Sequence, residues 1–135
     1  MSDNVRGALE SHLATISNPL PTEYEGVSFT PENDVAYQSA YLLDGGTDDL
    51  CLAFDGRYKL TGIFQITLRY PTGQGSGGAE SEALRLISHF ARGTVLTKNN
   101  MQVRILKTPI KKNLGIEADR LLRSVRVSFE AYNLI

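Results

Sequence analysis

Residues 57–70 read Arg-Tyr-Lys-Leu-Thr-Gly-Ile-Phe-Gln-Ile-Thr-Leu-Arg-Tyr, and this stretch decides the fold of the 135-residue chain. Every second position is apolar or glycine, while most of the intervening positions are polar. The first set is Tyr58, Leu60, Gly62, Phe64, Ile66, Leu68 and Tyr70. This period of two predicts a long strand with one face toward a core. Gly62, in its middle, indicates a bulge or bend.

Outward from this strand, shorter segments have the same period and two have a helical one. We expect strands at residues 25–29, 36–43, 50–54, 101–105 and 125–132. Helical spacing predicts a helix over 5–16, with Val5, Leu9, His12, Leu13 and Ile16 on one face, and a second over 79–91, with Ala83, Leu84, Ile87 and Phe90 inward. Residues 44–49 read as a turn and Asp55-Gly56 as a hairpin signal. The segment 107–120 is interrupted by Pro109, and 116–122 is compatible with a helical turn.

This order predicts an α+β fold. We expect a two-layer sandwich, in which a mainly antiparallel or mixed β-sheet carries two main helices on one face. The opposite sheet face should meet water or another subunit, and it bears Arg57, Lys59, Arg69, Arg126 and Glu130. The length and a 41% apolar fraction fit one domain over residues 1–135.

Charge is sorted along the chain. Residues 1–55 hold ten acids and one base, whereas residues 56–126 hold thirteen bases and four acids, and the formal net charge is −1. Two interpretations stand side by side. Either the fold keeps an acidic and a basic side apart, which suits head-to-tail packing with copies of itself, or it brings the two halves together and mixes the charges.

Composition argues against several classes of protein. The one cysteine, Cys51, allows no internal disulfide and no cysteine-based metal cluster. No apolar run approaches the roughly 20 residues of a membrane span, and the N-terminus lacks the pattern of a signal peptide. A pI near 6.1 without any Trp does not favour a dedicated nucleic-acid binder.

A glycine-rich loop follows the long strand, made of Thr72, Gly73, Gln74, Gly75, Ser76, Gly77 and Gly78. It formally matches G-x-G-x-x-G. However, it follows an antiparallel pattern, and no acid stands about 20 residues later, as a dinucleotide site requires. Glu80 and Glu82 would also repel a phosphate. We therefore favour a mobile linker, with an assembly loop and a cofactor loop as the alternatives.

The remaining polar residues form no catalytic constellation. His12 and His89 lie on separate helices and fit packing or helix-end roles. The acids around the expected turns lack the twelve-residue pattern of a calcium loop, so we expect a solvated rim: Asp44, Asp48, Asp49 and Asp55. We expect no enzymatic activity, no cofactor and no metal.

The chain resembles the tail terminator proteins of long-tailed bacteriophages, the lambda-type group. The resemblance is carried by the helix 5–16, the segment 24–31, the strand 37–43, residues 62–68 leading through Pro71-Thr72-Gly73 to the glycine loop, and the strand 125–132. It departs in lacking the Trp-containing pair that the family usually has near residues 24–27; Tyr24-Glu25 stands there.

The resemblance implies a structural protein whose hexameric ring caps the tail tube, stops its polymerisation and offers a surface for head joining. The implied partners are copies of itself, the tail tube protein and a head-completion protein, in the virion tail and, during assembly, in the host bacterial cytoplasm. The alternatives are another head–tail connector or a nucleotide-binding enzyme using the glycine loop.

Charge sorting predicts which residues meet between copies. We expect the acids Asp44, Asp48, Asp49 and Asp55 to contact bases of a neighbour, drawn from Arg57, Lys59, Arg104 and Arg126. We expect the loop Thr72 to Gly78 to become ordered against the tube or a neighbour.

Overall fold

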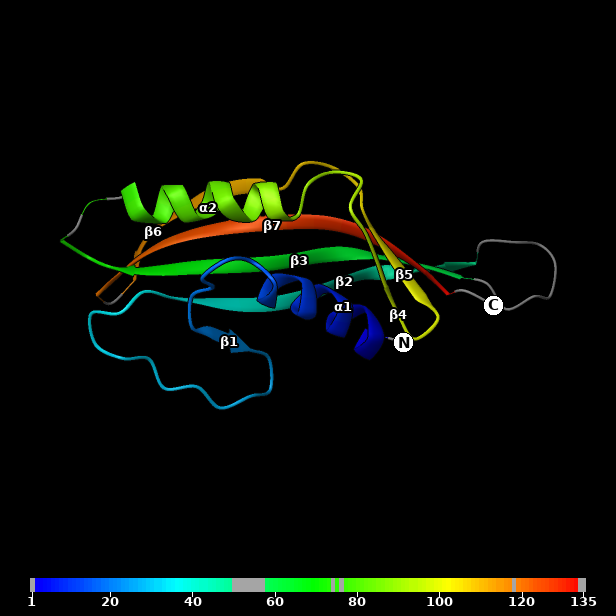
Figure 1. The fold of residues 1–135 in the computed structure, drawn as a ribbon, viewed down its shortest axis with the longest axis horizontal. Helices are drawn as coiled ribbons and strands as arrows, with labels where there is room; N and C mark the ends of the chain where they lie inside the picture. The colour runs from blue at the N-terminus through cyan, green and yellow to red at the C-terminus, as the bar shows by residue number, and fades with distance from the viewer. Residues whose placement is uncertain (1, 50–57, 74, 76, 118, 134–135) are drawn as a thin grey trace.

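A computed structural model describes residues 2–49, 58–73, 75, 77–117 and 119–133, which form two helices and seven strands (Figure 1). In chain order these are α1 (Ser2–Ala14), β1 (Thr22–Tyr24), β2 (Tyr37–Asp49), β3 (Tyr58–Pro71), α2 (Gly77–His89), β4 (Val95–Lys98), β5 (Met101–Ile105), β6 (Ile110–Glu117) and β7 (Arg120–Asn133). The predicted α+β class is confirmed. Neither described helix is long and apolar enough to cross a membrane.

The seven strands form one sheet in the order β1-β2-β3-β7-β5-β4, and β6 pairs with the first half of β7 beside β5. All pairs are antiparallel except the short β1–β2 pair. The fourteen-residue strand β3 lies between β2 and β7, with Phe64 opposite both Leu42 and Val127. The stretch with the clearest alternation thus organises the sheet.

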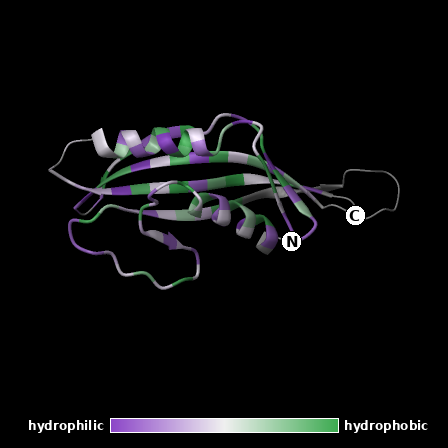
Figure 2. Ribbon diagram, in the orientation of Figure 1, coloured by the Kyte–Doolittle hydropathy of each residue, from purple (hydrophilic) through white to green (hydrophobic). Residues whose placement is uncertain are grey.

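The core lies between the helices and one face of the sheet. The alternation of apolar and polar residues along β3 and β7 is visible in Figure 2. The fully buried residues of this layer include Leu9 and Leu13 of α1, Leu86 of α2, Phe64, Ile66 and Leu68 of β3, and Val125, Val127 and Phe129 of β7. The ring of Phe90, just after α2, lies 5.9 Å from that of Phe64. Burial of these side chains is the main force that holds the two layers together.

The turn expected at residues 44–49 is wrong, because β2 continues to Asp49. Its register shifts between Asp44 and Gly46, so the extra residue is absorbed in a bulge opposite Gly62. A Cβ atom on Gly62 would lie 2.5 Å from the carbonyl oxygen of Leu43 and 3.0 Å from Phe129. The glycine therefore permits a close approach at the bulge, and cross-strand bonds to β3 outweigh the low strand propensity of Asp and Gly.

The strand expected at 25–29 is also wrong. The parallel strand β1 lies earlier, at Thr22–Tyr24, and Gly26 has a φ of 77° in the turn that follows. The reason is a tertiary one, since β1 is defined only by its pairing with Gln38–Ala40 of β2.

The segment 107–120, which the sequence left unassigned, and the possible helical turn at 116–122 contain strand instead. Residues up to Glu117 belong to β6, which forms a hairpin with β7, and Gly115 adopts a φ of 83° at a register shift. Hydrogen bonding to β7 overrides a local pattern that by itself favours neither state. The short strand β4, which pairs with β5, has no counterpart among the predicted strands.

The inward stripe of α2 is rotated from its predicted position. Leu84 is 62% exposed, whereas Leu86 is fully buried together with Ala79, Ala83 and Phe90. Ile87 packs at the border of the core. The predicted stripe of α1 is confirmed, because Val5, Leu9, Leu13 and Ile16 are buried. The expected strand 50–54, Cys51 and the Asp55-Gly56 hairpin lie outside the described residues.

Candidate assembly surface

The sheet face that looks away from the helices carries polar, charged and apolar side chains. Alternate residues of β3 lie on it, and cross-strand neighbours continue the pattern, as in the row Tyr41, Gln65, Arg126 and Ile110. Leu43 and Ile110 on this face are 50% and 51% exposed. A sheet face with exposed apolar side chains beside partly exposed basic ones is suited to contact with another protein.

Charge follows the order of the strands. The strands β1 and β2 at one side of the sheet hold four acids and no base: Glu23, Asp44, Asp48 and Asp49. The other five strands hold nine bases and two acids. Of the two interpretations of the charge sorting, the sheet therefore favours separation, with an acidic edge at β1–β2 and basic strands beyond it.

The predicted interface residues divide into two groups. Lys59 is the register partner of Asp48 within the same chain, so these two positions are already neighbours before any assembly. Arg104 on β5 and Arg126 on β7 lie on the basic side of the sheet, separated from β2 by β3. Asp44 stands opposite Gly62 and Asp49 opposite Tyr58. Asp55 and Arg57 lie outside the described residues.

A cluster around Tyr37 ties the segment before β2 to the start of β7. The guanidinium carbon of Arg120 lies 5.1 Å from the Tyr37 ring centroid and that of Arg69 lies 6.0 Å from it. Arg120 also donates hydrogen bonds to the carbonyl oxygens of Val35 and Glu32. Sequence reasoning missed this cluster, because its members lie on three separate segments.

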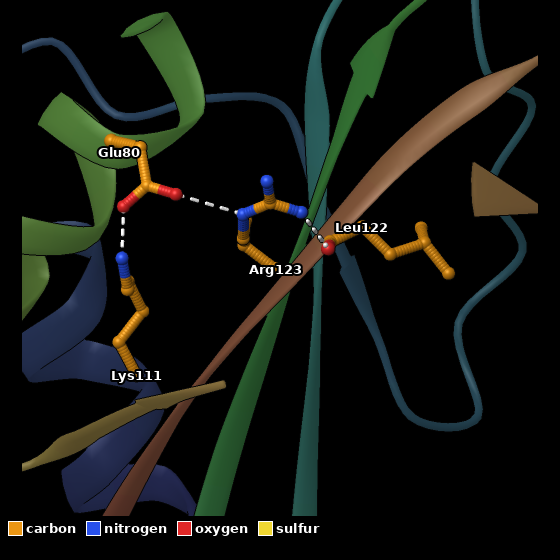
Figure 3. Close-up of polar contacts among 4 residues, drawn as sticks. All are labelled: Glu80, Lys111, Leu122 and Arg123. Carbon is orange, nitrogen blue, oxygen red and sulfur yellow. Dashed lines mark hydrogen bonds and ion pairs between the residues drawn. The ribbon is translucent and has the colours of Figure 1, made fainter. Parts of the chain in front are cut away.

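Glu80 anchors the start of α2 to the β6–β7 hairpin (Figure 3). Arg123 Nε donates to Glu80 Oε1 at 2.9 Å, and Lys111 Nζ donates to Glu80 Oε2. Arg123 Nη1 also donates to the carbonyl oxygen of Leu122 at 2.9 Å. Hydrogen bonds from Lys111 and Arg123 lower the pKa of the Glu80 carboxyl. The helix that follows the glycine loop is thus fixed to two adjacent strands, β6 through Lys111 and β7 through Arg123.

The predicted glycine loop begins directly after β3, but its last two residues, Gly77 and Gly78, form the start of α2. The amide of Thr72 donates to the carbonyl oxygen of Asp119 at 3.1 Å. Gly73 and Gly75 have φ angles of 91° and 76°, and a Cβ atom on either would have no atom within 4 Å. Gln74 and Ser76 lie outside the described residues. No group of three His, Cys, Asp or Glu side chains able to hold a metal occurs in the described part of the chain.

The acidic edge contains a hollow that sequence reasoning missed. Its lining is Glu23, Tyr24, Glu25, Gly26, Val27, Ser28 and Tyr41. Glu23 Oε1 accepts a hydrogen bond from Ser39 Oγ at 2.8 Å, and Glu25 Oε1 accepts one from the Leu42 amide at 2.5 Å. Arg6 Nη2 lies 3.7 Å from Glu25 Oε1. Two carboxylates are thus held at the rim of a hollow in which Val27 is 62% exposed.

His12 and His89 join the ends of the two helices, which agrees with the helix-end role predicted for them. Their rings stack with centroids 4.1 Å apart. Nε2 of each ring donates to the main-chain carbonyl oxygen of the other residue, at 2.7 Å and 2.5 Å. Burial lowers the pKa of His12. The sequence did not reveal the pairing, because 77 residues separate the partners.

Comparison with known proteins shows which family the chain matches. A family model described as phage tail terminator protein matches residues 4–129. Ten chains of solved structures match, and one of them is 26% identical with a TM-score of 0.73. That match covers 100% of this chain and 96% of the other chain. No curated protein matches.

Proposed function

Because the chain belongs to the phage tail terminator family, a structural family of the virion tail, we propose that its copies cap the finished tail tube and stop its polymerisation. The observation that carries the proposal is the family match over residues 4–129, together with a solved structure of the same fold over the whole chain. Residues 1–135 act as one domain in this role, without a catalytic centre or cofactor.

We further propose that the active form is a hexameric ring. One side of the ring contacts the tail tube protein, and the other offers a surface to a head-completion protein. A ring built from one kind of subunit needs two different, complementary surfaces on each copy. The acidic edge at β1–β2 and the basic strands beyond it supply such a pair. Assembly takes place in the host bacterial cytoplasm.

Charged residues guide the contact between neighbours in this proposal. The acids Asp44, Asp48, Asp49 and Asp55 meet basic residues of the next copy, drawn from Arg57, Lys59, Arg104 and Arg126. The separation of Arg104 and Arg126 from β2 within one chain supports a role between chains for these two. Lys59 is the register partner of Asp48 in its own chain, and we assign it to both the contact within the chain and the contact between copies.

The segment Thr72 to Gly78 acts as an assembly loop, and its residues before α2 become ordered on contact with the tube or a neighbour. The positive φ angles and open surroundings of Gly73 and Gly75 support this role. Amide hydrogen exchange tests it directly. Amides of this loop should exchange rapidly in the subunit alone and become protected on tubes, and an already protected loop would contradict the assignment.

Tube length is the measurement that tests the function. Tube protein that polymerises in the presence of this chain should give shorter tubes with a ring at one end in electron micrographs. A variant with Asp48→Lys and Asp49→Lys should form fewer rings. Unchanged tube lengths and no bound protein would overturn the proposed function. Unchanged ring formation by the variant would overturn only the charge pairing.

A further inference from the structure

The edge strand β6 is exposed to solvent along its whole length. All eight of its residues, Ile110–Glu117, are exposed, and three of them are large apolar side chains: Ile110, Leu114 and Ile116, at 51%, 43% and 66%. One edge of β6 pairs with β7, and no strand of the described chain pairs with the other. Exposed edge strands with apolar side chains pair readily with another chain.

This strand is also held in place on its inner side. Lys111 donates to Glu80 of α2, which fixes the strand to the body of the subunit. Lys112, the next residue, is exposed, lies on the other face and has no ion-pair partner among the described residues. A fixed strand that presents an unpaired lysine beside exposed apolar side chains loses little conformational freedom on docking, which lowers the entropic cost of binding.

One cross-strand row of the sheet connects Lys112 with the acidic edge. From β6 to β1 the row runs Lys112, Ser124, Thr67, Ser39 and Glu23. Its three middle residues are buried and small, so the two ends carry the charge. Four strand spacings separate the ends, which is roughly 19 Å along the sheet. Lys112 and Glu23 of one subunit therefore cannot meet, but those of two adjacent subunits can.

The neighbouring row carries the apolar counterpart. Ile110 stands at its β6 end and Tyr41, which lines the acidic hollow, at its β2 end. The hollow also presents the exposed side chain of Val27 beside Glu23 and Glu25. One edge of the subunit therefore presents a lysine beside an isoleucine. The opposite edge presents a pair of carboxylates beside a tyrosine and a valine.

We propose that β6 of one copy docks in the acidic hollow of the next copy, with Lys112 against Glu23 and Glu25 and with Ile110 against Tyr41 and Val27. The inference rests on the proposed ring and names its contact. A two-fold pairing of β6 with a second β6 would instead bring the lysines of the two strands together, which like-charge repulsion disfavours. The head-to-tail arrangement pairs opposite charges and repeats, as a ring requires.

Disulfide trapping tests this contact. In a Cys51→Ser background, Lys112→Cys and Glu23→Cys are combined in one chain, and rings or tube-bound subunits are oxidised. The expected result is a ladder of covalent multimers on a denaturing gel, ending at the number of subunits in the ring. The control pair is Arg92→Cys with Glu23→Cys, because Arg92 is exposed outside β6. The control should give no ladder.

The native sequence offers a second test that needs no new cysteine. A zero-length carbodiimide reagent should join Lys112 to Glu23 or Glu25, and mass spectrometry should find the cross-link only in assembled protein. Lys112→Glu should raise the concentration needed for assembly by roughly tenfold, whereas the matched reversal Arg92→Glu should leave it unchanged.

The outcomes separate the contact from the function. Rings that form without the ladder and without the cross-link would overturn the contact and leave the terminator role in place. Cross-links from Lys112 to the tube protein instead of to Glu23 or Glu25 would also overturn it. If the native chain neither forms rings nor binds tubes, the proposed function fails first.

Discussion

At the scale of single residues, the distance to neighbouring atoms decides whether a glycine can be replaced by a residue with a side chain. Gly62 lies opposite the β2 bulge, and a Cβ atom there would meet the Leu43 carbonyl oxygen at 2.5 Å. Backbone on this side and the Phe129 ring on the other leave no room for a methyl group. At Gly77, by contrast, a methyl group would have no other atom within 4 Å.

Replacement of Gly62 tests this steric interpretation. Gly62→Ala should lower the free energy of unfolding by about 1–3 kcal/mol through overpacking, as measured by urea denaturation. Gly77→Ala, at the start of α2, should leave stability unchanged or slightly raised. A fully stable Gly62→Ala variant would show that the bulge rearranges freely.

The stacked histidines make a pH prediction. In the folded state, burial lowers the pKa of His12 from its ordinary value of 6.5. The hydrogen bond to the His89 carbonyl opposes this shift, and the electrostatic interaction with the His89 ring adds to it. The unfolded chain therefore binds a proton first as pH falls, and the stability that His12 contributes is present above pH 6.5 and lost below it. Titration by NMR should give a His12 midpoint below 6.5; a higher midpoint would contradict this account.

At the scale of elements, helix α2 shows how packing determines which residues of an amphipathic helix are buried. Sequence periodicity included Leu84 in the inward face, yet Leu84 is 62% exposed and Leu86 is fully buried. Both residues lie in one helix and have the same side chain, so the difference is one of rotation about the helix axis. The contact of α2 with β7 and β3 sets that rotation.

Two alanine variants measure the rotation. Leu86→Ala should cost about 2–5 kcal/mol of unfolding free energy, because it opens a cavity in the core. Leu84→Ala, its matched control on the same helix, should change stability by no more than about 0.5 kcal/mol. Equal costs for the two variants would contradict the observed orientation of α2.

At the scale of the whole molecule, the order of strands turns a charge pattern along the chain into opposed edges. The acids of β1 and β2 lie at one side and the bases of β4, β5 and β6 toward the other. Contacts between such edges weaken when salt screens them, since the Debye length falls from about 8 Å at 0.15 M to about 3 Å at 1 M.

Light scattering across a salt series tests the charged contact. The protein concentration below which rings dissociate into subunits should rise with salt, because screening removes part of the attraction between the two edges. The unfolding transition of the subunit, followed over the same salt range, serves as the control. Rings indifferent to salt would retain the terminator role and contradict charge-paired edges.

The sequence by itself determined the elements whose own side chains repeat with a clear period. These elements are the strands β3 and β7, with their alternation, and the helix α1, with its apolar face. In each, the local period of apolar residues identifies the face that is buried. The two-layer α+β arrangement followed from those faces, since each must be covered by another element.

Only the tertiary structure decided β1, β6, residues 44–49 of β2 and the pairing of His12 with His89. These segments are defined by partners far away in the chain, which supply hydrogen bonds that local propensity does not encode. The row from Lys112 to Glu23 belongs to the same class. It exists because five strands align in register, and no spacing along the sequence records that alignment.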